Sequence, residues 1–219
     1  MPSSYPMTYH LPWSPGATDD NDTLRTVNNF LSKPGHNKTL VMTEKLDGVN
    51  CCLNSSGVYV RDHGDISFHP AFDYVKGLWG KIRGRLEEGE EIFGENCYAV
   101  HSIAYRSVPD YFFVFNIKRR GIWLSYDEMI LRSEELGLST TPRLFKGIVV
   151  TEKRLHSLCL LFMRQPSNFG NDREGIIIRI ADEFKDQDFE KSIAKCALPE
   201  FGQSVNYWLD KRIVKQIKK

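Results

Sequence analysis

The residues best suited to chemistry are a lysine and its acidic neighbours. The sequence reads Glu44-Lys45-Leu46-Asp47-Gly48 directly after the apolar, β-branched stretch 39–43. A lysine amine is a nucleophile only when unprotonated, and its ordinary pKa is about 10.4. Nearby positive charge lowers that pKa, and a strand end gives the amine a rigid support. The alternative is a strand that simply turns at Asp-Gly, so the segment needs support from the rest of the chain.

Three other charged residues are candidates for the same site, and for Glu174 and Lys195 a purely structural role is less natural. Glu95 ends a predicted strand, and Glu174 precedes an isoleucine-rich strand expected at 175–180. Lys195 lies among apolar neighbours, where a solvated lysine is unexpected. Phe115 lies on the same strand face as Phe113, so it can stack on a flat ring or belong to the core. Surface carboxylates and surface salt bridges are the alternatives for the charged residues.

The elements that position these residues follow from hydrophobic periodicity, caps and turns. Apolar, β-branched runs predict strands, and apolar residues three or four apart predict helices. We expect strands at 39–43, 51–53, 58–61, 91–94, 111–117 and 175–180, with a hairpin turn at 54–57. We expect helices after Asp22, over 70–87, between Ser125 and Gly137, from Thr151, and from about 203. Strands and helices alternate unevenly, which favours a single α+β domain without an internal linker.

Composition narrows the function classes. Among 219 residues, 41% are hydrophobic and the net charge is +1, so nucleic-acid binding requires a local basic patch. The basic stretch 211–219 is either that patch or a solvated helix end. Five cysteines without a CxxC pair, and no signal peptide or apolar span, favour a cytoplasmic protein with reduced thiols, without membrane or zinc site.

The segment around Lys45 resembles a known motif. Lys45-Leu46-Asp47-Gly48 is similar to the KxDG nucleotidyl-acceptor motif of ATP-dependent DNA and RNA ligases and mRNA capping enzymes. Further resemblances follow in family order along the chain: Arg61-Asp62-His63-Gly64, Phe93-Gly94-Glu95-Asn96, Phe113-Val114-Phe115-Asn116-Ile117, Glu174-Gly175-Ile176-Ile177-Ile178-Arg179 and Ser192-Ile193-Ala194-Lys195. His101-Ser102-Ile103 and Tyr105 add a likeness to small RNA ligases of the phage and editing type.

The resemblance implies a role for each matched residue. Lys45 would take AMP from ATP, Asp47 would accept a hydrogen bond in the turn, and Gly48 would allow the close approach of a phosphate. Glu174 would hold Mg²⁺, with Mn²⁺ as an alternative. Within the nucleotide-binding set, Glu44 would read the adenine edge, Glu95 would hold the ribose and Phe115 would stack on the adenine. That set also contains Asn50 and the cations Arg61, Arg179 and Lys195, the last of these counted as catalytic.

Two departures from the family pattern concern the cations. Arg179 stands where the broader family usually has lysine, which keeps the charge but changes its geometry. Cys196 and Ala197 follow Lys195, where a second basic residue is usual, and Lys191 is a candidate replacement. The last cationic motif is therefore the least complete part of the resemblance.

Length decides between members of the superfamily. With 24 residues after Lys195, we expect no OB-fold domain of the kind that DNA ligases and capping enzymes carry. We expect a nucleotidyltransferase domain over 1–200, with antiparallel sheets flanked by helices, and a short basic helical tail over 201–219. The implied function is an ATP-dependent RNA ligase that joins 5′-phosphate and 3′-hydroxyl ends of RNA or a nicked duplex, supplied by a separate end-healing kinase or phosphatase. The alternatives are a minimal DNA nick ligase and an idle end-binding protein.

Overall fold

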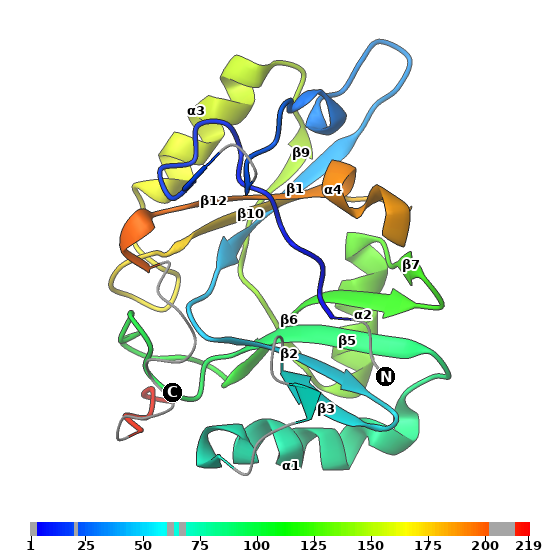
Figure 1. Cartoon of the computed structure of the whole chain (residues 1–219), viewed down its shortest axis with the longest axis vertical. Coiled ribbons are helices and arrows are strands. Elements are labelled where there is room, and N and C mark those ends of the chain that lie inside the picture. Colours follow the sequence, from blue (N-terminus) through cyan, green and yellow to red (C-terminus); the bar gives the residue numbers. More distant parts are fainter. Residues whose placement is uncertain (1–3, 20–21, 61–63, 66–68, 202–212) are drawn as a thin grey trace.

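Two sheets, one above the other, organise the chain in a computed structural model that describes residues 4–19, 22–60, 64–65, 69–201 and 213–219 (Figure 1). The upper sheet has the order β12-β10-β1-β9, and all its pairings are antiparallel. Its strands are β12 (Ile193–Ala197), β10 (Gly175–Ile180), β1 (Thr39–Lys45) and β9 (Arg143–Ile148).

The lower sheet is larger and has the order β11-β7-β6-β5-β2-β3-β4. Its strands are β11 (Phe184–Lys185), β7 (Ile122–Trp123), β6 (Phe112–Arg119), β5 (Glu90–Asn96), β2 (Val49–Asn54), β3 (Gly57–Val60) and β4 (Gly64–Asp65). The short β8 (Ser139–Thr140) pairs with β6 in parallel. Because residues 46–48 alone separate β1 from β2, the chain crosses from one sheet to the other at the KxDG segment.

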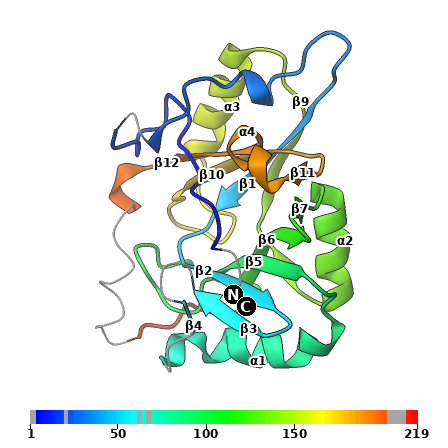
Figure 2. The same cartoon turned by 45° about the vertical axis from the view of Figure 1, so that its right-hand side comes forward.

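Helices cover the outer faces of both sheets. In the two views α3 (Glu152–Met163) lies over the upper sheet, whereas α1 (Asp73–Ile82) and α2 (Tyr126–Leu136) border the lower one (Figures 1 and 2). The short α4 (Phe189–Ser192) leads into β12, and 3₁₀ turns lie at 28–30, 70–72, 83–85, 186–188 and 199–201. Among the described residues, none of the helices has the length and apolar character needed to cross a membrane.

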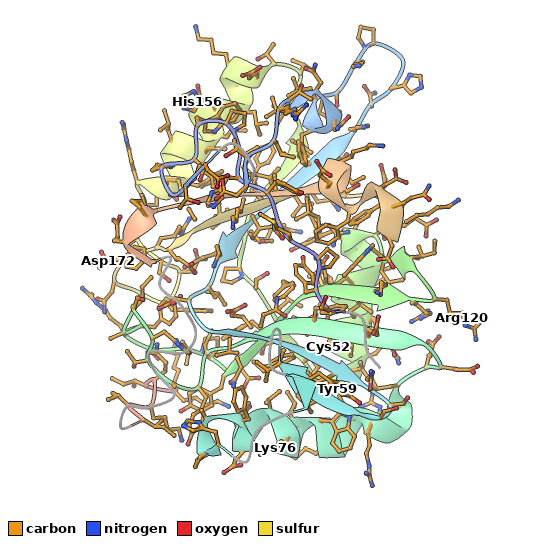
Figure 3. The ribbon with its side chains drawn as sticks, viewed as in Figure 1. Cys52, Tyr59, Lys76, Arg120, His156 and Asp172 are labelled. Carbon is orange, nitrogen blue, oxygen red and sulfur yellow. The ribbon has the colours of Figure 1, made fainter. Side chains whose placement is uncertain are left out.

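Hydrophobic side chains form separate cores on either side of the sheets and between them. One core joins the lower sheet to α1 and α2, and another joins the upper sheet to α3. A third core, rich in aromatic residues, joins the sheets to each other and includes Cys52, Phe93, Trp123 and Ile193. Figure 3 shows Cys52, a member of this third core, on the lower sheet. All five cysteines are free, as their number and spacing predicted, and all five are also buried.

Most of the elements expected from the sequence are confirmed. β10 has the predicted limits, the predicted hairpin is β2 and β3, and the predicted 70–87 helix is the shorter α1 with 3₁₀ flanks. Ser125 forms a complete capping box with Glu128, and Gly137 ends α2 with a φ of 72°. Thr151 caps α3 by accepting a hydrogen bond from the Arg154 N–H. These caps satisfy backbone groups locally, which is why short sequence patterns predict them.

Other expectations were wrong or lie outside the described residues. The helix expected after Asp22 is absent: a 3₁₀ turn at Asn28–Phe30 replaces it. Asp22 does not cap that turn but accepts hydrogen bonds from Thr18 and Thr23. The strands β9 and β12 were not predicted. The expected tail helix from about 203 falls on residues 202–212, and Arg61 falls on 61–63, both outside the described part.

Candidate active site

Strand register places Lys45 beside a carboxylate from a distant part of the chain. Lys45 ends β1 and lies opposite Gly175, the first residue of β10. Its Nζ therefore reaches Glu174, the residue before β10, and lies 2.5 Å from Oε1. The Lys45 side chain is 29% exposed, whereas that of Glu174 is 8% exposed. The amine is thus held by a buried partner and remains accessible from outside.

The charges around Lys45 are mainly negative. Burial lowers the pKa of Lys45, but the carboxylates of Glu174, Glu95 and Asp47 outweigh burial and raise the pKa above its ordinary value. The sequence interpretation relied on a bound metal and basic side chains to lower this pKa, whereas the described residues around Lys45 raise it in the chain without ligands. A protonated amine is not a nucleophile, so attack requires that the negative charge around it be neutralised first.

The segment between the two sheets is fixed by a loop that follows β5. Asp47 Oδ2 accepts hydrogen bonds from the N–H groups of Ser102 (2.7 Å) and Ile103 (2.6 Å). The Asp47 N–H donates to the Tyr105 hydroxyl at 2.8 Å. These hydrogen bonds of Asp47 thus join it to a distant loop, whereas the sequence interpretation expected a hydrogen bond within its own turn.

Gly48 is constrained by protein atoms. A Cβ at this position would lie 2.6 Å from the Asn96 carbonyl oxygen and 3.0 Å from Cγ of Glu95. Larger residues are therefore excluded by the close approach of β5. The sequence interpretation assigned this close approach to a phosphate, and the structure assigns it to β5.

Glu44 has one oxygen held by the protein and one left without a partner. It is 1% exposed, and its Oε2 accepts the Asn168 N–H at 2.9 Å and lies 3.5 Å from the Arg173 guanidinium. Its Oε1 is buried without a hydrogen-bond partner among the described residues. Glu174 Oε2 is in the same situation. Buried acceptors of this kind are costly unless a ligand satisfies them.

The lower sheet supplies the opposite side of the site. Asn50 on β2 pairs with Glu95 on β5, and both side chains are partly exposed. Burial raises the pKa of Glu95 to about 8, with Lys45 opposing the shift and Glu174 and Asp47 adding to it. Burial thus disfavours the charged form of this carboxyl group, and a cation or a hydrogen-bond donor that approaches it favours ionisation.

The two phenylalanines of β6 have different environments. Phe113 is 1% exposed and packs with Tyr105 and Phe169 in a core cluster. Phe115 lies at a bulge, where Val114 pairs with Gly94 and Asn116 pairs with Phe93. It is partly buried and meets the Tyr5 ring edge-on, with centroids 5.1 Å apart. Of the two rings, Phe115 is therefore the one available to a ligand.

The basic residues predicted for the site have different surroundings. Lys195 on β12 pairs with Ile177 on β10 and lines the site. Arg179 is 3% exposed, and its guanidinium donates to the side chain of Asn116 and to the carbonyls of Leu124 and Ile180. Arg179 therefore connects the two sheets. A contact with phosphate, predicted from the sequence, would have to use its remaining donors. Lys191 lines a separate groove, which argues against a role as replacement cation.

A cavity of about 830 Å³ lies where these side chains meet. Every predicted site residue that the structure describes lines it: Glu44, Lys45, Asp47, Asn50, Glu95, Phe115, Glu174, Arg179 and Lys195. The described residues contain no group of three or more His, Cys, Asp or Glu side chains that could hold a metal ion alone. Any metal here would need ligands from a bound molecule or from water, in addition to Glu174 Oε2, an unsatisfied oxygen beside Lys45.

The sequence interpretation missed the N-terminal side of the cavity. Tyr5, His10 and Gly16 line it, and the segment bonds to β12 through Lys195 N–H to Tyr9 and Leu11 N–H to Lys195. Burial lowers the pKa of His10 to about 4, and Lys195 adds to this effect, so its ring is neutral at neutral pH. Nothing in the local pattern around His10 predicts its position, because a contact with β12 over this sequence distance leaves no periodic signal.

Fold and site together define the class of protein. A lysine at the crossing between two antiparallel sheets, paired with a carboxylate at the start of β10, is the arrangement expected of a covalent nucleotidyltransferase. The RNA ligase family model matches residues 38–197, which is most of the chain. The chain therefore belongs to the RNA ligase family.

Comparison with solved structures shows the same fold at low sequence identity. An archaeal ATP-dependent RNA ligase is 14% identical, with a TM-score of 0.59 over 90% of this chain and 49% of that one. A Naegleria gruberi RNA ligase mutant with ATP and Mn is 14% identical, with a TM-score of 0.55 over 90% and 61%. A putative ATP-dependent DNA ligase from Aquifex aeolicus is 16% identical, with a TM-score of 0.55 over 90% and 50%.

The chain thus spans between about half and three fifths of the length of these relatives. A search of curated protein sequences found no significant match.

Proposed function

We propose that the chain is an ATP-dependent RNA ligase that joins 5′-phosphate and 3′-hydroxyl ends through an AMP group carried on Lys45. The observation that carries the proposal is the Lys45–Glu174 pair of 2.5 Å in a cavity large enough for a nucleotide, within the part of the chain that matches the RNA ligase family. The lysine is accessible and its partner is buried. Lys45 is therefore positioned by Glu174 and can be reached by a nucleotide in the cavity.

The chemistry balances in three transfers. The Lys45 amine attacks the α-phosphorus of ATP: a P–N bond forms, the bond to the pyrophosphate breaks, and the amine loses its protons. The AMP then passes to a 5′-phosphate, which releases the amine. A 3′-hydroxyl finally attacks that phosphate and releases AMP. Glu174 orients the amine before the first transfer, and Asp47 fixes the segment that carries it.

The remaining side chains of the cavity would bind the nucleotide. Glu44 Oε1 is a buried acceptor without a partner, which suits the amino group of adenine. Glu95 would accept a hydrogen bond from the ribose, and Phe115 would stack on the base. Asn50 and Lys195 would contact the sugar or the phosphates, and Arg61 and Arg179 would add positive charge. Each of these roles is a proposal that rests on the position of the residue or on its motif.

A divalent metal fits one feature of the cavity. Glu174 Oε2 is buried and has no partner among the described residues, so it is the protein oxygen available to Mg²⁺ or Mn²⁺. When bound, the metal would neutralise charge on the phosphates. The Naegleria gruberi relative was solved with ATP and Mn, which supports the same requirement here.

Five free cysteines support a reducing compartment such as the cytoplasm.

Incubation with labelled ATP and Mg²⁺ tests the first transfer. We expect one AMP per chain, mapped to Lys45 by mass spectrometry of peptides after denaturation. Lys45→Ala should abolish the adduct, because it removes the amine that is paired with Glu174. Lys146→Ala is a matched control, since Lys146 is also a strand lysine paired with a carboxylate but lies outside the cavity. An adduct that persists in Lys45→Ala, or a wild-type chain that forms none, would refute the proposal.

Sealing assays identify the polynucleotide. We expect the chain to seal a nicked duplex with ribonucleotides at the 3′ side of the nick, once the 5′ end is phosphorylated by a separate kinase. Equal or faster sealing of an all-DNA nick would point to a DNA nick ligase instead. An adduct without any sealing would point to a protein that binds polynucleotide ends.

A further inference from the structure

The segment 213–219 lies against the loop that holds Asp47. In Figure 1 this segment, in red, lies beside the green loop after β5. Backbone hydrogen bonds join the two: Val100 N–H to Val214 O (2.7 Å), Gln216 N–H to Tyr98 O (3.0 Å) and Val108 N–H to Ile217 O (2.8 Å). The segment is therefore paired along both ends of the loop 97–111.

Gln216 is the buried centre of this contact. It is 3% exposed, and its amide group is satisfied by the loop alone. Its Nε2 donates to the Ile103 carbonyl at 2.8 Å, and its Oε1 accepts the Tyr105 N–H at 2.9 Å. The Tyr111 hydroxyl donates to the Gln216 backbone carbonyl at 3.2 Å. A glutamine with both ends of its amide bonded in a buried site fixes the backbone that it contacts.

The residues that Gln216 holds are also those that hold Asp47. The Ile103 N–H donates to Asp47 Oδ2, and the Tyr105 hydroxyl accepts the Asp47 N–H. The chain of contacts therefore runs from Gln216 through Ile103 and Tyr105 to Asp47, two residues from Lys45. Every link is a hydrogen bond of 2.6 to 2.9 Å between groups that are largely buried.

The basic side chains of the segment serve the same attachment. Lys215 Nζ lies over the rings of Tyr98 and Tyr111, at 5.0 and 5.1 Å from their centroids. Lys218 Nζ lies 3.3 Å from Asp110 Oδ1 and 5.1 Å from the Tyr74 centroid. The sequence interpretation predicted that these basic side chains contact a polynucleotide or solvent. The structure instead uses these two for cation–π and ionic contacts with the body of the domain.

We propose that Gln216 is a positioning residue for the transfer of AMP to Lys45, acting through the loop 101–105 and Asp47. This inference rests on the function proposed for Lys45, and it assigns a role to a residue outside the stretch 38–197 that matches the family. Gln216 does not line the cavity that contains Lys45. Its effect is on where the KxDG segment lies, so it should change the rate of transfer rather than the binding of ATP.

Single-turnover adenylation of the full chain tests the effect on rate. Gln216→Leu keeps the volume and removes both hydrogen bonds, and we expect the rate constant at saturating ATP to fall about ten- to a hundredfold, because small displacements of a nucleophile have effects of this size. The ATP concentration for half-maximal rate should change less than about twofold. Val214→Ser is the matched control, since Val214 is 61% exposed on the same segment, and its rate should equal that of the wild type. An unchanged rate in Gln216→Leu overturns the inference and leaves the function of Lys45 intact.

Hydrogen exchange of the Ser102 and Ile103 amides gives a readout that needs no activity. Both amides bond to Asp47, so Gln216→Leu should speed their exchange about tenfold or more in the chain without ligand. Lys218→Met loosens the segment from the surface without leaving buried groups unpaired, and it should give smaller changes of the same sign. It serves as the decisive variant if Gln216→Leu does not fold. Unchanged exchange at both amides in the folded variants overturns the inference, whatever the wild-type chain does with ATP.

Discussion

Two groups of buried carboxylates in this domain differ in how they are paired. Glu90, at the start of β5, is 1% exposed, and both of its oxygens accept hydrogen bonds from Arg132, at 2.9 Å. Arg119 adds a bond of 3.0 Å. Burial raises the pKa of Glu90, but these bonds outweigh burial and hold the pKa below its ordinary value. In the cavity, Glu174 has one lysine partner and one oxygen with none among the described residues.

The pKa values follow this difference. Burial raises the pKa of Glu174 despite Lys45, and it raises the pKa of Glu95 to about 8. Both carboxylates are therefore costly to ionise until a ligand supplies positive charge or donors. Incomplete pairing marks a site that a ligand completes, whereas complete pairing marks a structural cluster. We therefore expect substitutions in the cavity to affect chemistry and substitutions around Glu90 to affect stability.

The largest expected effect is the contrast between Glu174→Gln and Glu90→Gln: the first should lower the adenylation rate, and the second should lower stability. Glu174→Gln should lower the rate of adenylation by about a hundredfold or more, because it removes the carboxylate that orients Lys45 and is available to the metal. Its free energy of unfolding should change by less than about 1 kcal/mol, since the lost charge was poorly compensated. Glu90→Gln should cost about 3 kcal/mol of stability, because it removes the buried carboxylate that Arg119 and Arg132 share.

Adenylation rates and urea unfolding of both variants provide the measurements. At a temperature where Glu90→Gln remains folded, its rate should lie within about threefold of the wild type. If Glu174→Gln adenylates normally, or if Glu90→Gln loses adenylation while folded, the distinction between the two groups is wrong.

The stability contributed by Glu95 and by Glu90 should change with pH in opposite directions. The folded pKa of Glu95, about 8, exceeds its unfolded value of 4.5, so the folded chain binds a proton more tightly between these values. Its contribution is full below pH 4.5 and is lost as the pH rises towards 8, and we expect a loss of about 1 to 3 kcal/mol. The folded pKa of Glu90 is lowered, so its contribution is present at neutral pH and is lost in acid.

Urea unfolding of the metal-free chain between pH 7 and pH 8 checks the sign for Glu95, because His10, whose folded pKa is about 4 and whose ordinary pKa is 6.5, makes stability rise with pH only below this interval. Glu95→Gln should flatten the decline towards pH 8, and Glu90→Gln should leave that decline in place. A wild-type chain whose stability rises over this interval would contradict the assignment for Glu95.

The sequence predicted elements well where the signal is local. The capping box of Ser125 and Glu128 and the isoleucine run of β10 are such signals, and both are confirmed. β9 was missed because it is an edge strand of mixed exposure that contains Lys146 and Gly147. The helix expected after Asp22 failed because tertiary contacts decide this segment: Leu24 and Val27 are buried without helical structure.

The sequence named residues that the structure, where it describes them, brings to one cavity, but it did not predict their geometry. Ordered motifs named the residues, and strand register then brought Lys45 to Glu174 across a long stretch of sequence. The direction of the Lys45 pKa could not be read from the sequence, because it depends on which carboxylates lie closest in space. Likewise, the role proposed for Gln216 depends on its hydrogen bond with Tyr105, which lies 111 residues earlier in the sequence. No local sequence pattern predicts such a contact.

The smallest expected effect compares two aromatic residues of one strand. Phe115→Leu should raise the ATP concentration for half-maximal adenylation about five- to tenfold, because stacking of a base on an aromatic ring is worth about 1 to 3 kcal/mol. Its stability should change little, since Phe115 lines the cavity and is only partly buried. Phe113→Leu should do the reverse, because Phe113 is 1% exposed in a core cluster. Titration of the adenylation rate with ATP, together with thermal unfolding, measures both quantities. Equal ATP requirements in the two variants would show that the adenine lies elsewhere in the cavity, and they would leave the lysine and its carboxylates in the roles argued above.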